Sequence, residues 1–586
     1  MALGTITNII DRSEITVASA PVEEYDDGPI ILAPTFSYKG PEEFGLYNNV
    51  QYFKNFGSAN FARYGQNSIQ IANVLASGAR IATKRMVPTD AALANSTITA
   101  KITTIEQEEG QPNKVVITLG VTSAVGARSM DSVIESVEAT EQPSGTFALF
   151  TIADIGRGPS LKKFNLVPLN ETSKNMKQMF YQLNVTENDE AAESTKCVML
   201  PDTVINGICY EIGEVVQDTM SQIQAYSYND QIEKFMEALA IATGKDIEDI
   251  KFQDFLFGTT RRGEAWANVT VDIENGVDLS STDGVPLSNG AFGTYGEYPI
   301  KNKDYYNSAV LSFFDGTATP KIYDQRSLRV TAVFDAQWDI PTKEAVVELA
   351  EHRKDFMFFR DFGNAITSID DIREMRSKLT RSTFTCDFAQ SYKIIDPYSS
   401  KHIGVTAIYD VALKIIPHII NHVSAPFAGA LNSASLDSCL PGTLNFEPVK
   451  TNKIDEIAQL EDLRVNCAGY YNYGKSLIVE SVYTSQEKYT QLSFCNNVMA
   501  FQRVVREIRD VCNNVRFVSG SVAIDTYTIA VNEVIDKYIG DFTELSFAYV
   551  EDAIALENKI YTGEIHFQFE PFFQAEDFKL YMDKAA

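Results

Sequence analysis

Residues 327–361 read SLRVTAVFDAQWDIPTKEAVVELAEHRKDFMFFRD, and this stretch decides the fold class. Its first part, 327–335, is rich in β-branched and apolar side chains and predicts a buried strand. Pro341 then opens a segment with helical spacing, and proline is favoured in the first turn of a helix. A second apolar run, FMFFRD, ends at Asp361. Strand, helix and strand in this order predict a βαβ unit of a mixed α/β domain.

The same order occurs nearer the N-terminus. The β-rich stretch IILAPTFSYKG begins at Ile30, a helix-like stretch covers 68–79, and residues 80–87 are typical of a strand. Residues 96–195 differ, because Thr, Val and Ile alternate there with few helical periods. We therefore predict a multidomain α+β or mixed α/β protein with an inserted β-rich domain. The expected parts are an extended arm at 1–28, an α/β domain at 29–95, the insertion at 96–195, the α/β domain continued with surface loops at 196–438, a C-terminal core domain at 439–562 and a strand arm at 563–586.

Composition limits the function. The 586 residues, of 65.1 kDa, include 45% hydrophobic residues, as expected for a chain that folds around a core. Fifty Lys and Arg against 78 Asp and Glu give a net charge of −28, which repels nucleic acid and anionic membrane surfaces. No signal peptide is apparent, and Lys414 and Pro417 interrupt the best apolar run. We expect a soluble intracellular product with no direct nucleic acid or membrane partner.

The sequence offers no catalytic or metal-binding constellation. The seven cysteines are scattered without CxxC spacing, which favours reduced, mostly buried thiols. His418 and His422 lie one helical turn apart, but Ile419 stands where HExxH has its general base, so ordinary histidines are favoured over a metal site. No Ser or Cys lies in a nucleophile motif. We predict no catalytic residues, no cofactor and no metal, and therefore no enzyme.

One motif suggests an alternative. Gly469 to Ser476, GYYNYGKS, fits the P-loop pattern GxxxxGK[ST], in which Lys475 and Ser476 would meet phosphate and Mg²⁺. A P-loop must open a helix, whereas residues 477–483 are typical of a strand. A β-hairpin with glycines at 469 and 474 is favoured, and a P-loop nucleotide-binding protein is the alternative. A host-binding adhesin built on the β-rich insertion is a third hypothesis.

The C-terminus predicts two strands. Apolar Ile565, Phe567 and Phe569 alternate with polar residues, and a second alternation after Pro571 places Phe578, Leu580 and Met582 on one face. A terminal strand with one apolar face is stable only when it is paired, on its own sheet or with another chain.

These features together resemble the contractile-tail sheath proteins of bacteriophages and related injection machines. The N-terminal resemblance covers Gly28-Pro29, Gly40-Pro41, FGSANFARYG at 56–65 and VLASGARIATKRMVPTDAALA at 74–94, with Ala79 where a second glycine is common. The C-terminal resemblance covers HVSAPFAGALN, the 463–484 strand pair, the helix NNVMAFQRVVREI and the ending YTGEIHFQFEPFFQAEDFKLYM. Val482-Tyr483-Thr484 departs from the aromatic-Gly-x-Arg-Thr pattern of the family.

The resemblance implies a sheath core built from both chain ends. It implies a structural virion protein, assembled in the host cytoplasm, that forms hexameric rings stacked helically around a tail tube protein and contacts baseplate and tail terminator or neck proteins. Contraction of such a sheath drives the tube through the host envelope. Terminal strands would complete sheets in neighbouring subunits by β-augmentation. The residues given this role are Thr5, Ile6, Ile9, Ile10, Ile565, Phe567, Phe569, Phe578, Leu580 and Met582.

The helical stretch 498–512 carries Arg503, Arg506 and Arg509 off its apolar face. We expect these arginines either to contact an acidic tail tube or to meet acidic residues of their own domain.

Overall fold

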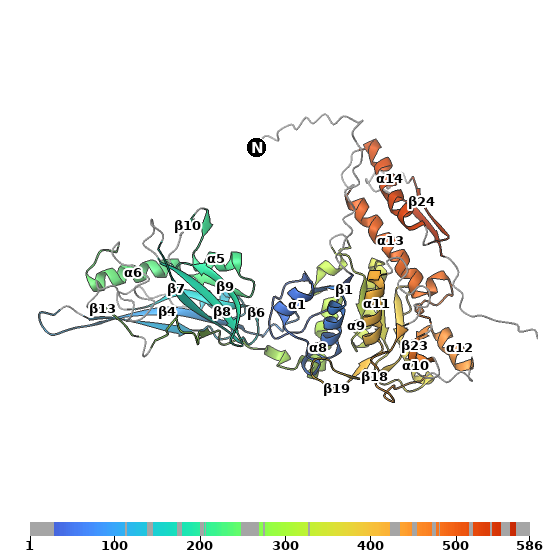
Figure 1. Cartoon of the computed structure of the whole chain (residues 1–586), viewed down its shortest axis with the longest axis horizontal. Helices are drawn as coiled ribbons and strands as arrows, with labels where there is room; N and C mark the ends of the chain where they lie inside the picture. Colours follow the sequence, from blue (N-terminus) through green and yellow to red (C-terminus); the bar gives the residue numbers. More distant parts are fainter. Residues whose placement is uncertain are drawn as a thin grey trace, which may run out of the picture.

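The computed structural model describes most of the chain. The described residues are 29–111, 114–136, 145–172, 179–199, 204–205, 207–247, 269–272, 276–325, 328–421, 434–447, 454–471, 476–479, 481–514, 520–539, 542–551 and 563–569. Figure 1 shows three parts: a β-rich domain at one end, an α/β body in the middle, and a helical lobe containing α13 and α14 on the other side of the body. The expected multidomain mixed α/β fold is confirmed.

The body is built on a seven-stranded sheet with strand order β2-β3-β1-β15-β16-β17-β21. All neighbouring strands are parallel except β2 and β3. Both βαβ units predicted from the sequence lie in this sheet, and Ile31 pairs with Ala332 where they meet. The strands are β1 (Ile30–Leu32), β2 (Gly45–Tyr47), β3 (Arg80–Thr83), β15 (Ala332–Phe334), β16 (Met357–Asp361), β17 (Thr385–Phe388) and β21 (Val465–Asn466).

The helices of the body begin and end where local chemistry favours it. Asp339 caps α9 by accepting a hydrogen bond from the backbone N–H of Thr342, Pro341 lies in the first turn, and Lys354 ends the helix in a left-handed conformation. The helices are α1 (Asn49–Phe56), α2 (Phe61–Tyr64), α3 (Gln66–Ala76), α8 (Lys303–Phe314), α9 (Ile340–Arg353), α10 (Ile369–Ser377), α11 (Ile408–Asn421) and α12 (Ile454–Leu463). Small sheets β18 (Ser391–Ile395) with β19 (His402–Thr406), and β20 (Ala434–Ser435), β23 (Ser476–Val479) and β22 (Gly469–Tyr471) complete the body.

The inserted domain contains two large sheets, ordered β12-β6-β4-β5-β13 and β14-β7-β8-β9, that share one apolar core with α5 and α6, and a two-stranded sheet of β10 and β11. Because β12, β13 and β14 join these sheets, the domain extends to Pro286, beyond the expected boundary at 195. The sequence pattern does not assign β12, β13 and β14 to this domain, because pairing between distant strands leaves no local periodicity. Its elements are β4 (Leu93–Ile105), β5 (Lys114–Thr122), α4 (Met130–Glu135), β6 (Thr146–Arg157), β7 (Lys162–Thr172), β8 (Met179–Glu187), β9 (Glu190–Cys197), β10 (Val204–Ile205), β11 (Ile208–Cys209), α5 (Ile212–Thr219), β12 (Ile223–Ser227), α6 (Asn229–Thr243), β13 (Val269–Asp272) and β14 (Val285–Pro286).

The lobe consists of α13 (Cys495–Asn514), α14 (Gly520–Tyr538), β24 (Glu544–Tyr549) and β25 (Gly563–Gln568). Val504, Val531, Ile535 and Phe569 contribute to its separate small core. The lobe is therefore a packed unit. The start of α13, with Cys495, Val498 and Met499, still belongs to the core of the body, and the core of the lobe begins at Ala500.

A charged cluster is buried at the carboxyl ends of β15 and β16. The Lys343 ammonium lies 2.8 Å from a carboxylate oxygen of Asp335 and 2.8 Å from one of Asp361. Burial, together with the Asp361 charge, raises the pKa of Asp335 to about 7. Two carboxylates facing one ammonium leave a net negative charge in the core, so Asp335 binds a proton more tightly in the folded chain than in the unfolded chain.

We expect this proton to make folding pH-dependent. Because the pKa of Asp335 is raised in the folded state, its contribution is present at low pH and is lost as the pH rises toward about 7. Relative to Asp335→Asn, the free energy of unfolding of the unaltered chain should fall by roughly 1 kcal/mol per pH unit between about pH 5 and 7. Urea titrations followed by Trp338 fluorescence in a Trp266→Phe background measure this. An identical pH dependence of the two proteins would contradict the assignment.

Candidate assembly surfaces

The terminal strand predicted from the alternation at 564–569 pairs within its own chain. β25 is antiparallel to β24, with Phe567 opposite Leu545 and Ile565 opposite Phe547. The apolar face packs on α13 and the segment after α14: the ring of Phe567 lies 4.6 Å from that of Phe501 between centroids. The Phe569 ring lies 4.9 Å from that of Phe542. Side chains 565, 567 and 569 therefore help to form the core of the lobe.

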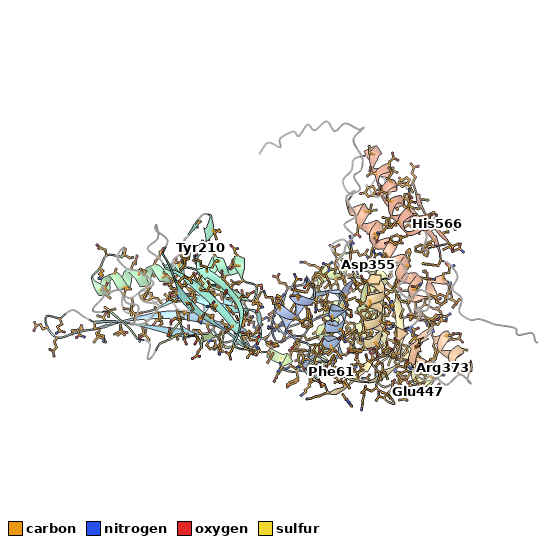
Figure 2. The ribbon with its side chains drawn as sticks, viewed as in Figure 1. Phe61, Tyr210, Asp355, Arg373, Glu447 and His566 are labelled. Carbon is orange, nitrogen blue, oxygen red and sulfur yellow. The ribbon has the colours of Figure 1, made fainter. Side chains whose placement is uncertain are left out.

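Among the described residues, the apolar face of this sheet is covered, but its backbone edges are not. Within the part of the chain that the structure describes, the β24–β25 sheet has two strands, and neither outer edge is paired. Exposed polar side chains cover its other face, among them Glu544, Ser546, Glu564 and His566 (Figure 2). Two strands alone are a marginal sheet, and free edges accept further strands. The remaining strand-arm residues, Thr5, Ile6, Ile9, Ile10, Phe578, Leu580 and Met582, lie outside the described residues.

The three arginines of α13 are engaged within the chain. Arg506 donates a hydrogen bond to the carbonyl of Asp355, and Arg509 donates two, each of 3.2 Å, to the carbonyl of Arg353. Arg503 donates to Glu507 at 3.2 Å and to the hydroxyl of Tyr538 at 2.9 Å. Asp355, labelled in Figure 2, lies where the lobe meets the body. Of the three arginines, Arg503 thus meets an acidic residue of its own helix, whereas Arg506 and Arg509 bind backbone carbonyls of the body. The tube contact of these residues stays a prediction.

These contacts form a joint between the lobe and the body. Arg353 and Asp355 lie around the C-terminal end of α9, where backbone carbonyls are left without helical partners and attract cations. Burial lowers the pKa of Arg506 to about 10, because the guanidinium is partly removed from water. Gln502 adds a hydrogen bond of 2.7 Å to the carbonyl of Phe356. The lobe is therefore fixed to the body by hydrogen bonds from α13 as well as by apolar packing.

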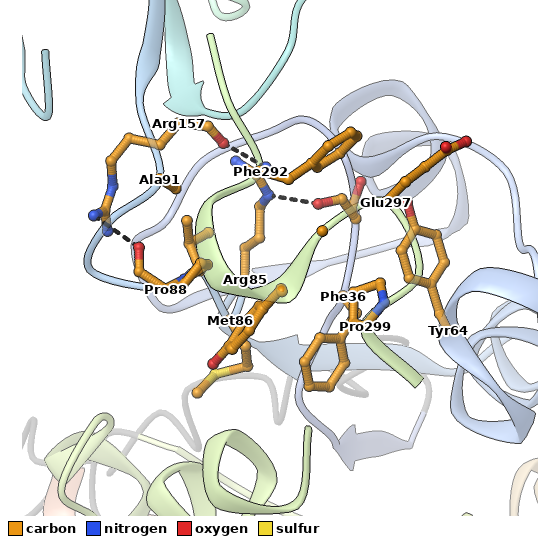
Figure 3. Close-up of a pocket in the computed structure, with 14 residues that line it drawn as sticks. Phe36, Tyr64, Arg85, Met86, Pro88, Ala91, Arg157, Phe292, Glu297 and Pro299 are labelled. Carbon is orange, nitrogen blue, oxygen red and sulfur yellow. Dashed lines mark hydrogen bonds between the residues drawn. The ribbon is translucent and has the colours of Figure 1, made fainter. Parts of the chain in front are cut away.

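A second joint connects the body to the inserted domain, and a small pocket lies beside it (Figure 3). Arg85 donates to the carbonyls of Ser37 and Gly40 at 3.0 Å each and to that of Arg157 at 2.6 Å. Arg157 in turn binds both carboxylate oxygens of Glu42. Burial opposes ionisation of Glu42, but the hydrogen bonds from Arg157 outweigh it and lower its pKa. The groups around the pocket thus bind one another across the joint.

Glycine backbones lie in direct contact at this joint. A Cβ atom on Gly156 would lie 2.1 Å from the carbonyl oxygen of Gly40, and one on Gly290 would lie 2.0 Å from that of Gly158. Two ion pairs flank the contact, Lys39 with Glu187 and Lys54 with Glu193. No sequence pattern indicates that Gly40 meets Gly156, because only the fold brings these residues together. The close backbone approach and the ion pairs indicate a rigid connection.

The motif that suggested nucleotide binding is part of a hairpin. Gly469 and Tyr471 belong to β22, and Ser476 begins β23, which is antiparallel to it. The helix that a P-loop requires after Ser476 is therefore replaced by a strand, as the hairpin prediction states. Gly474 and Lys475 lie outside the described residues.

Other candidate sites were also located. His418 lies in α11, next to Pro417, and His422 is outside the described residues. Across the described ranges, no three His, Cys, Asp or Glu side chains are grouped so that they could hold a metal ion. All seven cysteines are free thiols. None of the described helices is long and apolar enough to cross a membrane.

Comparison with known proteins gives structural similarities only. No model of a known family and no curated protein matches the chain. A sheath tail protein from Listeria innocua is similar at 8% identity over 93% of this chain and 95% of its own, with a TM-score of 0.46. One from Desulfitobacterium hafniense is similar at 10% identity over 92% and 97%, with a TM-score of 0.42. The contracted PVC sheath complex of an extracellular contractile injection system is similar at 13% identity over 48% and 80%, with a TM-score of 0.36.

Arg506→Ala should weaken the joint between lobe and body. The substitution leaves the carbonyl of Asp355 without its charged donor, which costs about 2 kcal/mol. Arg503→Ala, which removes a more exposed group that also pairs with Glu507, should cost less than about 1 kcal/mol. Hydrogen exchange of the α13 amides reports both changes. Equal exchange in the two variants would show that Arg506 does not hold the joint.

Gly156→Ala should destabilise the joint between the body and the inserted domain. The new methyl group must displace the Gly40 backbone, at a cost of roughly 2 kcal/mol or more. Gly404→Ala is the matched control, because a Cβ atom there meets nothing within 4 Å. Thermal unfolding and limited proteolysis between the two domains measure the effect. A Gly156→Ala protein as stable and as protease-resistant as the control would disprove close packing.

Proposed function

We propose that this chain is the structural, non-enzymatic subunit of a contractile tail sheath. Subunits polymerise as hexameric rings stacked helically around an inner tail tube and join the baseplate and the tail terminator or neck. Contraction drives the tube through the host cell envelope during genome delivery. The proposed location is the virion, after assembly in the host cytoplasm. The sequence resemblance at both chain ends suggests this function.

The observation that carries the proposal is the two-stranded sheet of the lobe. Its apolar face is already filled by α13, so further strands can be added only along the backbone edges of β24 and β25. The chain continues from Phe569 through residues 570–586, whose alternation at Phe578, Leu580 and Met582 predicts one more strand. Donation of this strand to the next copy completes the sheet.

Strand donation to a neighbour has a geometric consequence. One surface of each copy binds a different surface of the next, which is a heterologous contact, and such contacts build open helical assemblies unless the rotation closes. Rings stacked into a helix meet this condition. The covalent link between lobe and donated strand keeps neighbouring copies joined while they move.

The proposed contraction needs no nucleotide. The extended lattice is formed in a metastable state, and its rearrangement into a shorter and wider lattice releases free energy stored at assembly. Rigid joints at Arg85 and Arg506 fit this mechanism, because they let each copy move as one body. Every copy brings a charge of −28, so repulsion between copies should make assembly depend on salt.

Assembly of the pure chain tests the proposal. The full chain, produced without a tube protein, should form tubes that negative-stain electron microscopy detects, whereas a chain lacking residues 570–586 should stay folded and unassembled. The truncation starts at Glu570 because β25 belongs to the core of the lobe. Replacing Phe578, Leu580 and Met582 by Asp should have the same effect.

Lys579→Ser with Tyr581→Ser is the control, because it alters the other face of the predicted strand. Tubes of normal length from the truncated chain would refute strand donation. A full chain that stays monomeric at all concentrations would refute the sheath function.

A further inference from the structure

Arg464 lies in an aromatic setting on the surface of the body. It follows α12 and precedes β21, and its guanidinium carbon lies 4.8 Å from the ring centroid of Tyr489 and 5.8 Å from that of Tyr483. Phe494 supports both rings, with centroids 5.4 Å from Tyr483 and 5.9 Å from Tyr489. We call Arg464, Tyr483, Tyr489 and Phe494 the arginine platform. Cation–π contacts with two rings hold the guanidinium in place.

Within the described part of the chain, the guanidinium of Arg464 has no carboxylate partner. Arg464 forms no ion pair there, and its Nε atom is buried without a hydrogen-bond partner. Other arginines of the chain differ: Arg360 and Arg376 both bind Asp387. A planar guanidinium binds a carboxylate through two parallel hydrogen bonds, and a fixed side chain loses little entropy when it does so. Arg464 is thus prepared for a carboxylate that the described residues do not supply.

The local backbone keeps the guanidinium in position. Arg464 has a φ of 54°, a left-handed conformation that is uncommon for a residue other than glycine. Its N–H donates to the carbonyl of Glu461 at 3.0 Å, which closes the turn after α12. Such conformations are costly and often occur at functional positions.

The platform has the composition of a binding surface. Tyr, Arg and aromatic residues dominate the energetics of protein interfaces because they bury large areas with little loss of entropy. Tyr489 is 58% exposed, so its ring, with that of Tyr483 beside it, offers contact area next to the charge. The nearby exposed charges are mixed, with Glu461, Glu487 and Lys488, so the platform is no general basic patch. A specific carboxylate contact fits it better than non-specific attraction.

The platform adjoins the surface through which copies are proposed to join. Gln491 holds the last described residue of the lobe sheet: its Oε1 accepts from the N–H of Phe569 at 3.2 Å, and its Nε2 donates to the carbonyl at 3.4 Å. Gln491 lies two residues from Tyr489 and three from Phe494. The end of β25 and the platform are therefore neighbours.

We propose that the arginine platform accepts a carboxylate from a second copy of this chain. The inference rests on the proposed function, since it assumes that copies assemble. Charge complementarity identifies the partner: the chain has 78 acidic against 50 basic residues, so the surface of another copy is rich in carboxylates. The platform supplies the opposite charge, fixed beside the sheet that copies share.

Substitutions at the platform test this in the full chain. Arg464→Ala should raise the protein concentration needed for half-maximal assembly by at least about tenfold, as expected for a central interface residue. Arg464→Lys, which keeps the charge but loses the planar fork, should give an intermediate rise. Tyr489→Ala should weaken assembly, and Tyr489→Phe should not, because the ring remains. Sedimentation and negative-stain microscopy measure assembly, and thermal unfolding checks the fold.

Arg373→Ala is the matched control. Arg373, labelled in Figure 2, is an exposed arginine of α10 that already pairs with Asp370 at 2.6 Å, so its loss should leave assembly unchanged. Arg464→Ala or Arg464→Lys proteins that assemble like the unaltered chain would overturn the platform while the sheath function stands. If Arg464→Ala and Arg373→Ala changed assembly to the same extent, the platform would be overturned too. Failure of the unaltered chain to assemble would refute the sheath function, and the platform with it.

Discussion

The fold depends on one pairing, that of β1 with β15, which joins Ile31 to Ala332 across the inserted domain. Closing so long a stretch of chain costs conformational entropy, although this cost grows only slowly with length. The cost is offset by the buried parallel strands on either side, whose side chains Leu32, Val333 and Phe358 are fully or almost fully buried. Everything else is attached to this sheet: the insertion leaves it after β3, and the lobe begins beyond β21.

The two attachments share a physical principle. In each, a guanidinium with a pKa lowered by burial to about 10 donates to a backbone carbonyl on the other side of the joint: Arg85 of the body to Arg157 of the insertion, and Arg506 of the lobe to Asp355 of the body. Carbonyls are fixed in the backbone, so such bonds constrain position more closely than pairs of flexible side chains. A polar interface usually permits domain motion, but here it is combined with direct backbone contact at Gly156.

Sequence patterns predicted those parts of the structure that depend on local periodicity. The strand and helix at 327–361 were predicted within a few residues, as was the amphipathic helix that contains Arg506. The alternation at Ile565, Phe567 and Phe569 correctly indicated a strand with one apolar face, but not that β24 would pair with it. Pairing between distant segments, and hence the end of the inserted domain, leaves no periodic signal.

The candidate surfaces were harder to predict for the same reason. The arginine platform unites Arg464 with the separate stretch 483–494. Arg464 resembles any other charged residue after a helix until Tyr483 and Tyr489 are placed beside it. The P-loop pattern, by contrast, could be judged from the sequence. The residues after Ser476 are typical of a strand, which argues against the helix that a P-loop requires. Local sequence context therefore sufficed to reject the P-loop pattern but not to find the arginine platform.

The hydrogen bonds between Gln491 and Phe569 also limit how far the lobe can lie from a sheet that receives the donated strand. Because the chain is held at that point, segment 570–586 would tether a donated strand to the lobe in the proposed assembly. An extended chain gains at most about 3.4 Å per residue. Its reach is therefore no more than roughly 60 Å from the edge of the lobe. In any arrangement in which copies are linked by this segment, before or after a rearrangement, the receiving sheet must lie inside that radius. The length of segment 570–586 thus bounds how far neighbours that are linked through it can travel.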